Sequence, residues 1–157
     1  MAREIEKKFL LKNDTWRQSI KRSRQFVQGY LIGSTQASVR VRIEGEQAFI
    51  NIKSATLDVT RDEYEYEIPL TDAREMLESL CDKPLIVKAR HDVMFGNKKW
   101  EIDEFQGKNV GLLVAEIELD SVDEVFDMPE WAGQEVSDDA RYYNVCLVKH
   151  PYTTWDK

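Results

Sequence analysis

The sequence has few cysteines and histidines and no long apolar run. Its two cysteines, Cys81 and Cys146, show no CxxC spacing and are too few for a disulfide framework, so we expect reduced core residues. No segment approaches the ~18 apolar residues that span a bilayer, and the charged N-terminus lacks the apolar run of a signal peptide. These absences predict no membrane contact and a cytoplasmic location.

Several common catalytic motifs are also absent. The seven glycines form neither GxxxxGK[ST] nor GxGxxG, and no GxSxG or Cys/His pairing indicates covalent catalysis. His91 and His150 have no metal-site spacing and no cysteine partner, so zinc is disfavoured and both are expected to be structural.

The chain carries an excess of acidic residues, with a formal net charge of −7 over 157 residues. Surfaces that follow a nucleic-acid backbone are usually basic, so no nucleic-acid partner is expected. An anionic ligand held internally is still compatible with this charge. Because no Pro/Gly/Ser-rich linker interrupts the chain, we expect a single domain over residues 1–157.

Alternation of apolar and charged residues with period two dominates the chain and predicts β-strands. Eight segments are expected to be strands: 3–11, 25–32, 39–43, 50–53, 61–68, 87–90, 100–103 and 113–119. Turns at 44–46 and 96–97 and a longer loop at 107–111 favour an antiparallel meander. A helix is expected after Thr71 as N-cap and another after a capping box at Ser121–Glu124, with weaker helical patterns at 13–20 and 139–147.

Charged residues recur at i and i+2 within most strands and are sorted by sign, as in Arg40 and Arg42. An open sheet with its charged face in water explains any one such strand. The accumulated pattern favours a mainly β (α+β) fold in which eight antiparallel strands close into a barrel, with a charged interior and short helices packed against the apolar outer faces. Since burying ionised groups is costly, such an interior requires pairing or a ligand.

The inward charges suggest a specific chemistry. Carboxylates are the ligands that Mg²⁺ or Mn²⁺ prefers, and lysine and arginine bind phosphate oxygens. The candidate metal ligands are Glu4, Glu6, Asp103, Glu116 and Glu118, and the candidate phosphate-binding residues are Lys8, Arg40, Arg42, Lys53, Lys88 and Arg90. Acids that hold a metal beside bases that hold several phosphates form the arrangement that phosphoryl transfer requires.

The residues Glu4-Ile5-Glu6-Lys7-Lys8 resemble the ExExK signature of the CYTH superfamily of triphosphate tunnel metalloenzymes. The further matches are Arg40-x-Arg42, Lys53, Glu63-x-Glu65, Lys88-x-Arg90, Asp103, Glu116-x-Glu118 and a closing segment 135–144 similar to short bacterial members. The resemblance implies an eight-stranded tunnel with the metal and triphosphate ligands given above and with Glu63 and Glu65 in supporting roles. Glu4, Glu6, Lys8 and Lys88 are expected to act in catalysis, and the segment around Tyr142 and Tyr143 to cover one tunnel mouth.

The expected activity is metal-dependent hydrolysis of inorganic triphosphate, with slower turnover of nucleoside triphosphates. A class IV adenylyl cyclase, a thiamine triphosphatase and a polyphosphate-binding module without chemistry are the alternatives, and a ligand-free structural sheet is the simplest one. Apolar outer faces would allow a homodimer, as in some family members, although no segment requires it.

Overall fold

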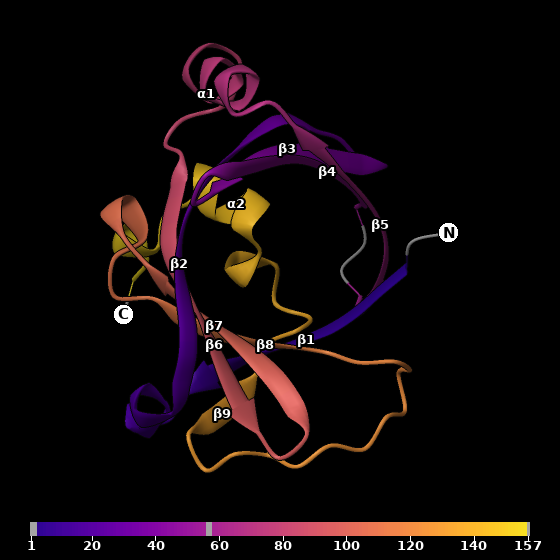
Figure 1. Cartoon of the computed structure of the whole chain (residues 1–157), viewed down its shortest axis with the longest axis vertical. Helices are drawn as coiled ribbons and strands as arrows, with labels where there is room; N and C mark the ends of the chain where they lie inside the picture. The colour runs from indigo at the N-terminus through magenta and orange to yellow at the C-terminus, as the bar shows by residue number, and fades with distance from the viewer. Residues whose placement is uncertain (1–2, 56–57, 157) are drawn as a thin grey trace.

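The computed structural model describes residues 3–55 and 58–156, most of which form β-strands (Figure 1). The strands are β1 (Arg3–Leu11), β2 (Ile20–Gly33), β3 (Ala37–Glu44), β4 (Gln47–Ser54), β5 (Thr60–Ile68), β6 (Ile86–Phe95), β7 (Lys98–Phe105), β8 (Leu113–Glu118) and β9 (Ala132–Glu135). The first eight confirm the predicted strands, several with longer bounds. Sequence analysis missed the four-residue β9.

The first eight strands close into an antiparallel barrel. The strand order is β5-β4-β3-β2-β6-β7-β8-β1, and β1 then pairs with β5 to complete the ring. Figure 1 views this ring end-on. Three residue pairs make the closing contact: Arg3 with Asp62, Glu4 with Arg61, and Ile5 with Thr60. Farther along, β1 exchanges β5 for β9, which pairs with Phe9 and Leu11.

A simple meander through all strands, as predicted, is wrong. Strands β2 to β5 form one meander and β6 to β8 another, but β2 pairs with β6, and β1 lies between β8 and β5. Helix α1 (Leu70–Ser79) lies in the connection from β5 to β6. Local turn signals correctly located the hairpins at Gly45 and Gly96, both with positive φ, but they contain no information about pairing between distant strands.

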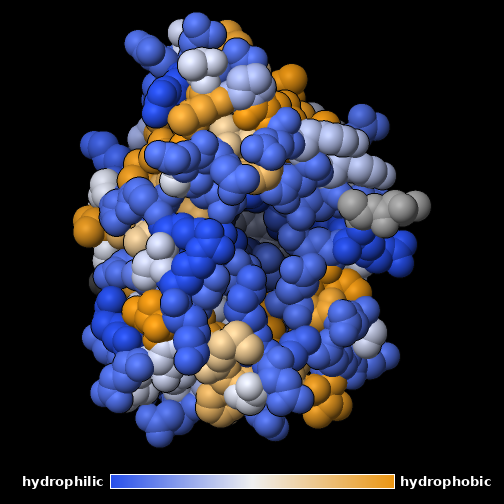
Figure 2. Space-filling view, in the orientation of Figure 1, coloured by the Kyte–Doolittle hydropathy of each residue, from blue (hydrophilic) through white to orange (hydrophobic). Residues whose placement is uncertain are grey.

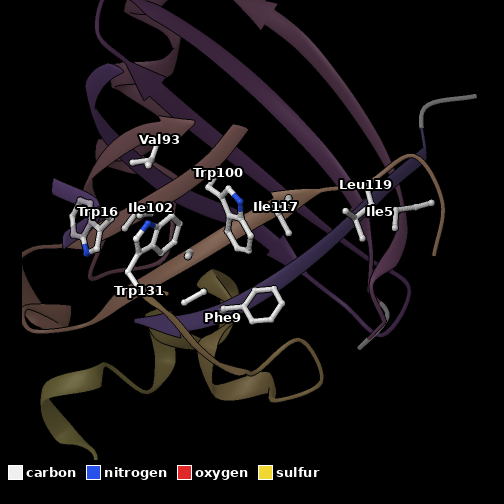
Figure 3. Packing of buried hydrophobic residues seen from close by; sticks show 11 residues of the cluster. Ile5, Phe9, Trp16, Val93, Trp100, Ile102, Ile117, Leu119 and Trp131 are labelled. Atoms are coloured by element: carbon white, nitrogen blue, oxygen red, sulfur yellow. The ribbon is translucent and has the colours of Figure 1, made fainter. Parts of the chain in front are cut away.

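The main hydrophobic cluster lies against the outer side of the barrel wall. It contains Trp100, Ile102 and Ile117, which alternate along their strands with inward-facing acids such as Glu101 and Glu116. Figure 3 shows this cluster, in which the Trp100 ring centroid lies 5.3 Å from that of Trp131 and 5.5 Å from that of Phe9. The core is therefore external to the tunnel.

An irregular segment, residues 119–131, covers this cluster where a helix was predicted. Ser121–Glu124 forms a turn in which the Glu124 amide donates to the Ser121 carbonyl at 3.2 Å. The Glu124 carboxylate accepts from the Asp120 amide at 2.6 Å and pairs with Lys98. Pro129, which lacks an amide donor, also limits how far a helix could extend from this turn.

The helices only partly match the predictions. Helix α1 has Pro69 rather than Thr71 as its N-cap and buries Ala73 and Leu77 against the outer face of β3 and β4. Tyr64 and Tyr66 on β5 are 40% and 58% exposed, so the expected covering of the outer faces by helices does not extend to them.

The weaker helical patterns are short helices in the structure. Residues 13–20 contain the 3-10 helix η1 (Thr15–Ser19), and residues 139–147 contain η3 (Ala140–Tyr142) and the start of α2 (Asn144–Lys149). The remaining short elements are the 3-10 helices η2 (Gly107–Asn109) and η4 (Tyr152–Thr154). None of the helices in the described part of the chain is long and apolar enough to cross a membrane.

Gly29 in β2 marks a close approach to the chain that follows α1. A Cβ atom there would lie 2.7 Å from Leu85 Cδ2 and 2.8 Å from Cys81 Cβ. We expect Gly29→Ala to lower the free energy of unfolding by about 1–3 kcal/mol, since both neighbours must shift. Urea unfolding measures this. Gly33→Ala is the control, because its Cβ meets only Val145 Cγ2 at 3.7 Å; equal losses in both variants would contradict the packing explanation.

Candidate active site

The barrel encloses a cavity lined mainly by charged side chains. Its basic lining residues are Lys8, Arg24, Arg40, Arg42, Lys53, Arg61, Lys88 and Arg90, and its acidic ones are Glu4, Glu6, Glu44, Glu63, Glu65, Glu101, Glu116 and Glu118. The volume is about 210 Å³, whereas a single water needs only ~10–15 Å³, so a hydrated linear anion fits. Figure 2, in the end-on orientation of Figure 1, shows a hollow in the molecular surface that is surrounded by hydrophilic residues.

Strand alternation accounts for this lining. In β1, Glu4, Glu6 and Lys8 point inward, while Ile5 and Phe9 join the outer core. The register then places Glu118 opposite Glu6 and Glu116 opposite Lys8 on β8. A slip of one residue would move every one of these charges to the outside, so the outer apolar cluster also fixes the inward set.

One group of ion pairs lies around Asp103. Its carboxylate accepts from Lys88 Nζ at 2.7 Å and from Arg90 Nε and Nη2 at 2.7 and 2.9 Å. Arg90 also donates to Glu116 at 2.8 Å, and Lys8 donates to the same Glu116. Two lysines and an arginine are thereby held by two carboxylates, and their positions are mutually dependent.

A second group lies on β3, β4 and β5. Lys53 Nζ lies 3.1 Å from Glu4 and 3.5 Å from Glu63, and Arg42 donates to Glu65 at 2.7 Å. Arg40 is held less tightly, with Glu63 at 3.9 Å. Glu63 and Glu65 therefore hold basic side chains, which is consistent with the predicted supporting roles.

Burial and neighbouring charges separate the carboxyl pKa values. Burial acts to raise the pKa of Glu116, but Lys8, Arg90 and Lys88 outweigh it and hold this pKa well below its ordinary value. Burial and repulsion from Glu116 raise the pKa of Glu6 to about 7 despite Lys8. Burial, together with Glu4, Glu101 and Glu63, also raises the pKa of Glu118. Among the bases, burial lowers the pKa of Lys88 to about 8, against the attraction of Asp103.

The acids at one side of the cavity suit a divalent cation. Glu6 and Glu118 are register partners on β1 and β8. Burial raises both pKa values first, and repulsion from nearby carboxylates adds to it, chiefly from Glu116 at Glu6 and from Glu4 at Glu118. A bound cation would relieve this repulsion. In the described residues, no three acidic, histidine or cysteine side chains are already gathered as a metal cluster. The donor set nevertheless has the hard oxygen chemistry of a Mg²⁺ or Mn²⁺ site.

Charged groups of arginine and lysine side chains lie close to two aromatic rings in the cavity. The Phe26 ring centroid lies 5.0 to 5.7 Å from the charged groups of Arg24, Arg42, Lys88 and Arg90. The Tyr143 ring centroid lies 5.5 Å from Lys8 Nζ and 5.2 Å from Arg61. These distances are within the range of cation–π attraction, so both rings already interact with cations of the protein.

The structure brings together nearly all of the predicted site residues. Every one lines the cavity except Asp103, which is 1% exposed and lies behind Lys88 and Arg90.

Tyr143, in the segment expected to cover one tunnel mouth, lines the cavity. The cavity is also lined by five residues that were not predicted as site residues: Arg24, Arg61, Glu44, Glu101 and Asn144. Three of them were within reach of the alternation: Arg61 precedes Glu63 by two residues, Glu44 follows Arg42 by two, and Glu101 precedes Asp103 by two.

Comparisons with known proteins find relatives along nearly the whole chain. A family model described as CYTH domain matches residues 2–146. The inorganic triphosphatase of Acetivibrio thermocellus is 45% identical over 152 residues, 97% of both chains, and that of Nitrosomonas europaea is 33% identical over 92% of this chain and 96% of its own.

Solved structures show the same fold. One inorganic triphosphatase structure has a TM-score of 0.67 at 31% identity, covering 94% of this chain and 95% of the other. A Hippeastrum protein at 15% identity, with a TM-score of 0.60 over 75% of this chain and 80% of its own, supports the fold alone.

The raised pKa of Glu6 predicts an unusual pH dependence of stability in metal-free protein. Between pH 4.5 and about 7, the folded state retains a proton on Glu6 that the unfolded chain has lost, so stability falls as pH rises through this window. Glu6→Gln should remove this contribution and stabilise the protein at pH 8 by on the order of 3 kcal/mol. Urea unfolding in EDTA at pH 5 to 8 tests this; parallel pH profiles for variant and wild type would contradict it.

Proposed function

This chain belongs to the CYTH domain family, and on that premise we propose that it hydrolyses inorganic triphosphate with a divalent metal ion. The observation that carries the proposal is the cavity inside the closed ring of strands, in which basic and acidic side chains face the same space. The identity to two inorganic triphosphatases over nearly the full length of each chain supports it.

We assign phosphate binding to the six predicted bases, Lys8, Arg40, Arg42, Lys53, Lys88 and Arg90. Each is already desolvated and lies against carboxylates, so phosphate oxygens replace existing partners and little further desolvation is needed. Arginines offer forked donors, and lysines offer compact charges. Lys8 and Lys88 then stabilise the negative charge that develops while water attacks the terminal phosphorus and the bond to the diphosphate leaving group breaks.

Glu4, Glu6, Glu116 and Glu118 are the carboxylates that would hold Mg²⁺ or Mn²⁺. When bound, such an ion neutralises phosphate charge and lowers the pKa of a bound water. We place Asp103 apart from these four, because it does not line the cavity and lies behind Lys88 and Arg90, which bind both of its oxygens. Its proposed role is to position these two cations.

The cavity favours a substrate without a base. A purine or thiamine ring stacked on Phe26 or Tyr143 would compete with the cations that lie over these rings. Adenylyl cyclase and thiamine triphosphatase activities therefore rank below inorganic triphosphatase. A binding module would need no acids for metal activation, yet eight acidic side chains line the described cavity.

We further propose a single domain over residues 1–157, a cytoplasmic location, and no nucleic-acid or membrane partner. The oligomeric state, including the homodimer, stays a prediction.

A turnover panel tests the activity. Purified protein with Mg²⁺ or Mn²⁺ is given inorganic triphosphate, ATP, GTP or thiamine triphosphate, and the products are separated chromatographically. Inorganic triphosphate should be the best substrate, giving orthophosphate and diphosphate, and Glu4→Gln should lower kcat at least about 100-fold because a metal ligand is lost. Glu67→Gln, an exposed β5 glutamate outside the cavity lining, is the matched control. Cyclic AMP from ATP, or binding without turnover, would refute the proposal.

Asp103→Asn separates the two roles considered for this residue. If Asp103 positions Lys88 and Arg90, the variant should raise the KM for inorganic triphosphate roughly tenfold and leave the metal concentration for half-maximal activity unchanged. It should also destabilise the fold by about 3–5 kcal/mol, since two buried cations lose their shared anion. A metal requirement that rises while KM holds constant would instead identify Asp103 as a metal ligand.

A further inference from the structure

Asn144, the first residue of α2, reaches the cavity from outside the barrel strands. Its Oδ1 accepts a hydrogen bond from Lys88 Nζ at 3.0 Å and another from Gln28 Nε2 at 3.1 Å. Asn144 lines the cavity together with Tyr143, and the Lys88 side chain is 1% exposed. The C-terminal segment thus contacts one of the phosphate-binding lysines directly.

Counting donors and acceptors fixes the direction of this chain of hydrogen bonds. A lysine ammonium has three donors and no acceptor, so the oxygen of Asn144 must face Lys88. Gln28 must then donate through Nε2, and its Oε1 is buried without a partner among the described residues. An unsatisfied buried oxygen is unfavourable, and buried groups of this kind require an explanation.

Within the part of the chain that the structure describes, two of the three Lys88 ammonium donors have acceptors and one is left over. One donor goes to Asp103 at 2.7 Å and one to Asn144, and Lys88 itself lines the cavity. Two fixed acceptors therefore determine where the third N–H points. Because Asn144 is neutral, it orients the ammonium without adding a negative charge that would repel phosphate.

The segment that carries Asn144 is anchored at several points. The Tyr143 hydroxyl donates to the Ser137 carbonyl at 2.7 Å, and the Ser137 hydroxyl accepts from the Lys8 amide at 3.0 Å. Leu147 and Val148 of α2 are buried against Ile86, two residues before Lys88. The chain on each side of Asn144 is therefore anchored to the barrel, and this fixes the position of the Asn144 side chain.

We propose that Asn144, in the C-terminal segment, is a positioning residue for substrate binding. Its side chain orients the Lys88 ammonium toward a phosphate oxygen of the substrate. The inference rests on the proposed function in that it takes inorganic triphosphate as the ligand. Part of the affinity for inorganic triphosphate would then depend on Asn144, an uncharged residue of α2 that lies on none of the barrel strands.

A double-mutant cycle tests this dependence. The dissociation constant of inorganic triphosphate is measured by calorimetry in EDTA, where metal-dependent turnover does not interfere, for wild type, Asn144→Ala, Lys88→Met and the double variant. Asn144→Ala should weaken binding roughly tenfold, and the double variant should bind no more weakly than Lys88→Met alone. Wild-type affinity in Asn144→Ala, or a further tenfold loss in the double variant, would overturn the proposal.

Two more variants serve as controls for the loss of affinity expected in Asn144→Ala. Asn144→Asp keeps the size and the oxygen acceptor but adds a negative charge, so it should fold and bind more weakly than wild type; unchanged affinity would count against the proposal. Tyr142→Phe alters the same segment, but this ring packs on Trp155 outside the cavity, and its affinity should equal that of wild type.

Calorimetry and turnover together distinguish failure of the Asn144 proposal from failure of the proposed triphosphatase activity. Wild-type binding without hydrolysis under metal would refute the triphosphatase and leave the cycle valid. No binding of inorganic triphosphate by wild type in EDTA, with turnover retained when metal is added, would overturn the Asn144 proposal and leave the triphosphatase standing.

Discussion

Ionised side chains in a closed barrel must be neutralised locally, and this constraint organises the whole molecule. A lone buried charge costs several kcal/mol, so the fold is tolerable only because each inward cation lies near an anion. Lys8 with Glu116, Lys53 with Glu4 and Arg42 with Glu65 satisfy this condition. The same pairing holds the site in shape, because cations already fixed in a desolvated space need little rearrangement to meet phosphate oxygens.

This constraint moves the hydrophobic core to an unusual place. Since the interior is charged, the apolar halves of the strands must be buried from outside, by α1, by residues 119–131 and by the C-terminal segment. Trp100 and Ile117 stabilise the wall, while Glu101 and Glu116, one residue away, line the cavity. Stability and chemistry therefore use opposite faces of the same strands.

Much of the fold and the site was predictable from sequence because both follow from period-two alternation. The eight strands and twelve of the thirteen predicted site residues were located in this way, and the same rule applied further would have added Arg61, Glu44 and Glu101. Asn144 was not accessible, since its contacts with Lys88 and Gln28 join residues 56 and 116 positions apart. The turn at Ser121 shows the converse limit, because the residues of a capping box are present, yet Glu124 accepts from the Asp120 amide and no helix follows.

The seam between β1 and β5 has a consequence for how the molecule responds to strain. Among the described residues, three register pairs close the ring there, together with a hydrogen bond from the Glu6 amide to the Val59 carbonyl at 2.9 Å. One of the pairs joins Glu4 to Arg61, both of which line the cavity. Parting of these two strands would open the cylinder and at the same moment pull Glu4 away from Lys53. An anion bound to residues on both sides of this seam would oppose the separation of β1 from β5, so ligand binding would stabilise the closed barrel as well as fill it.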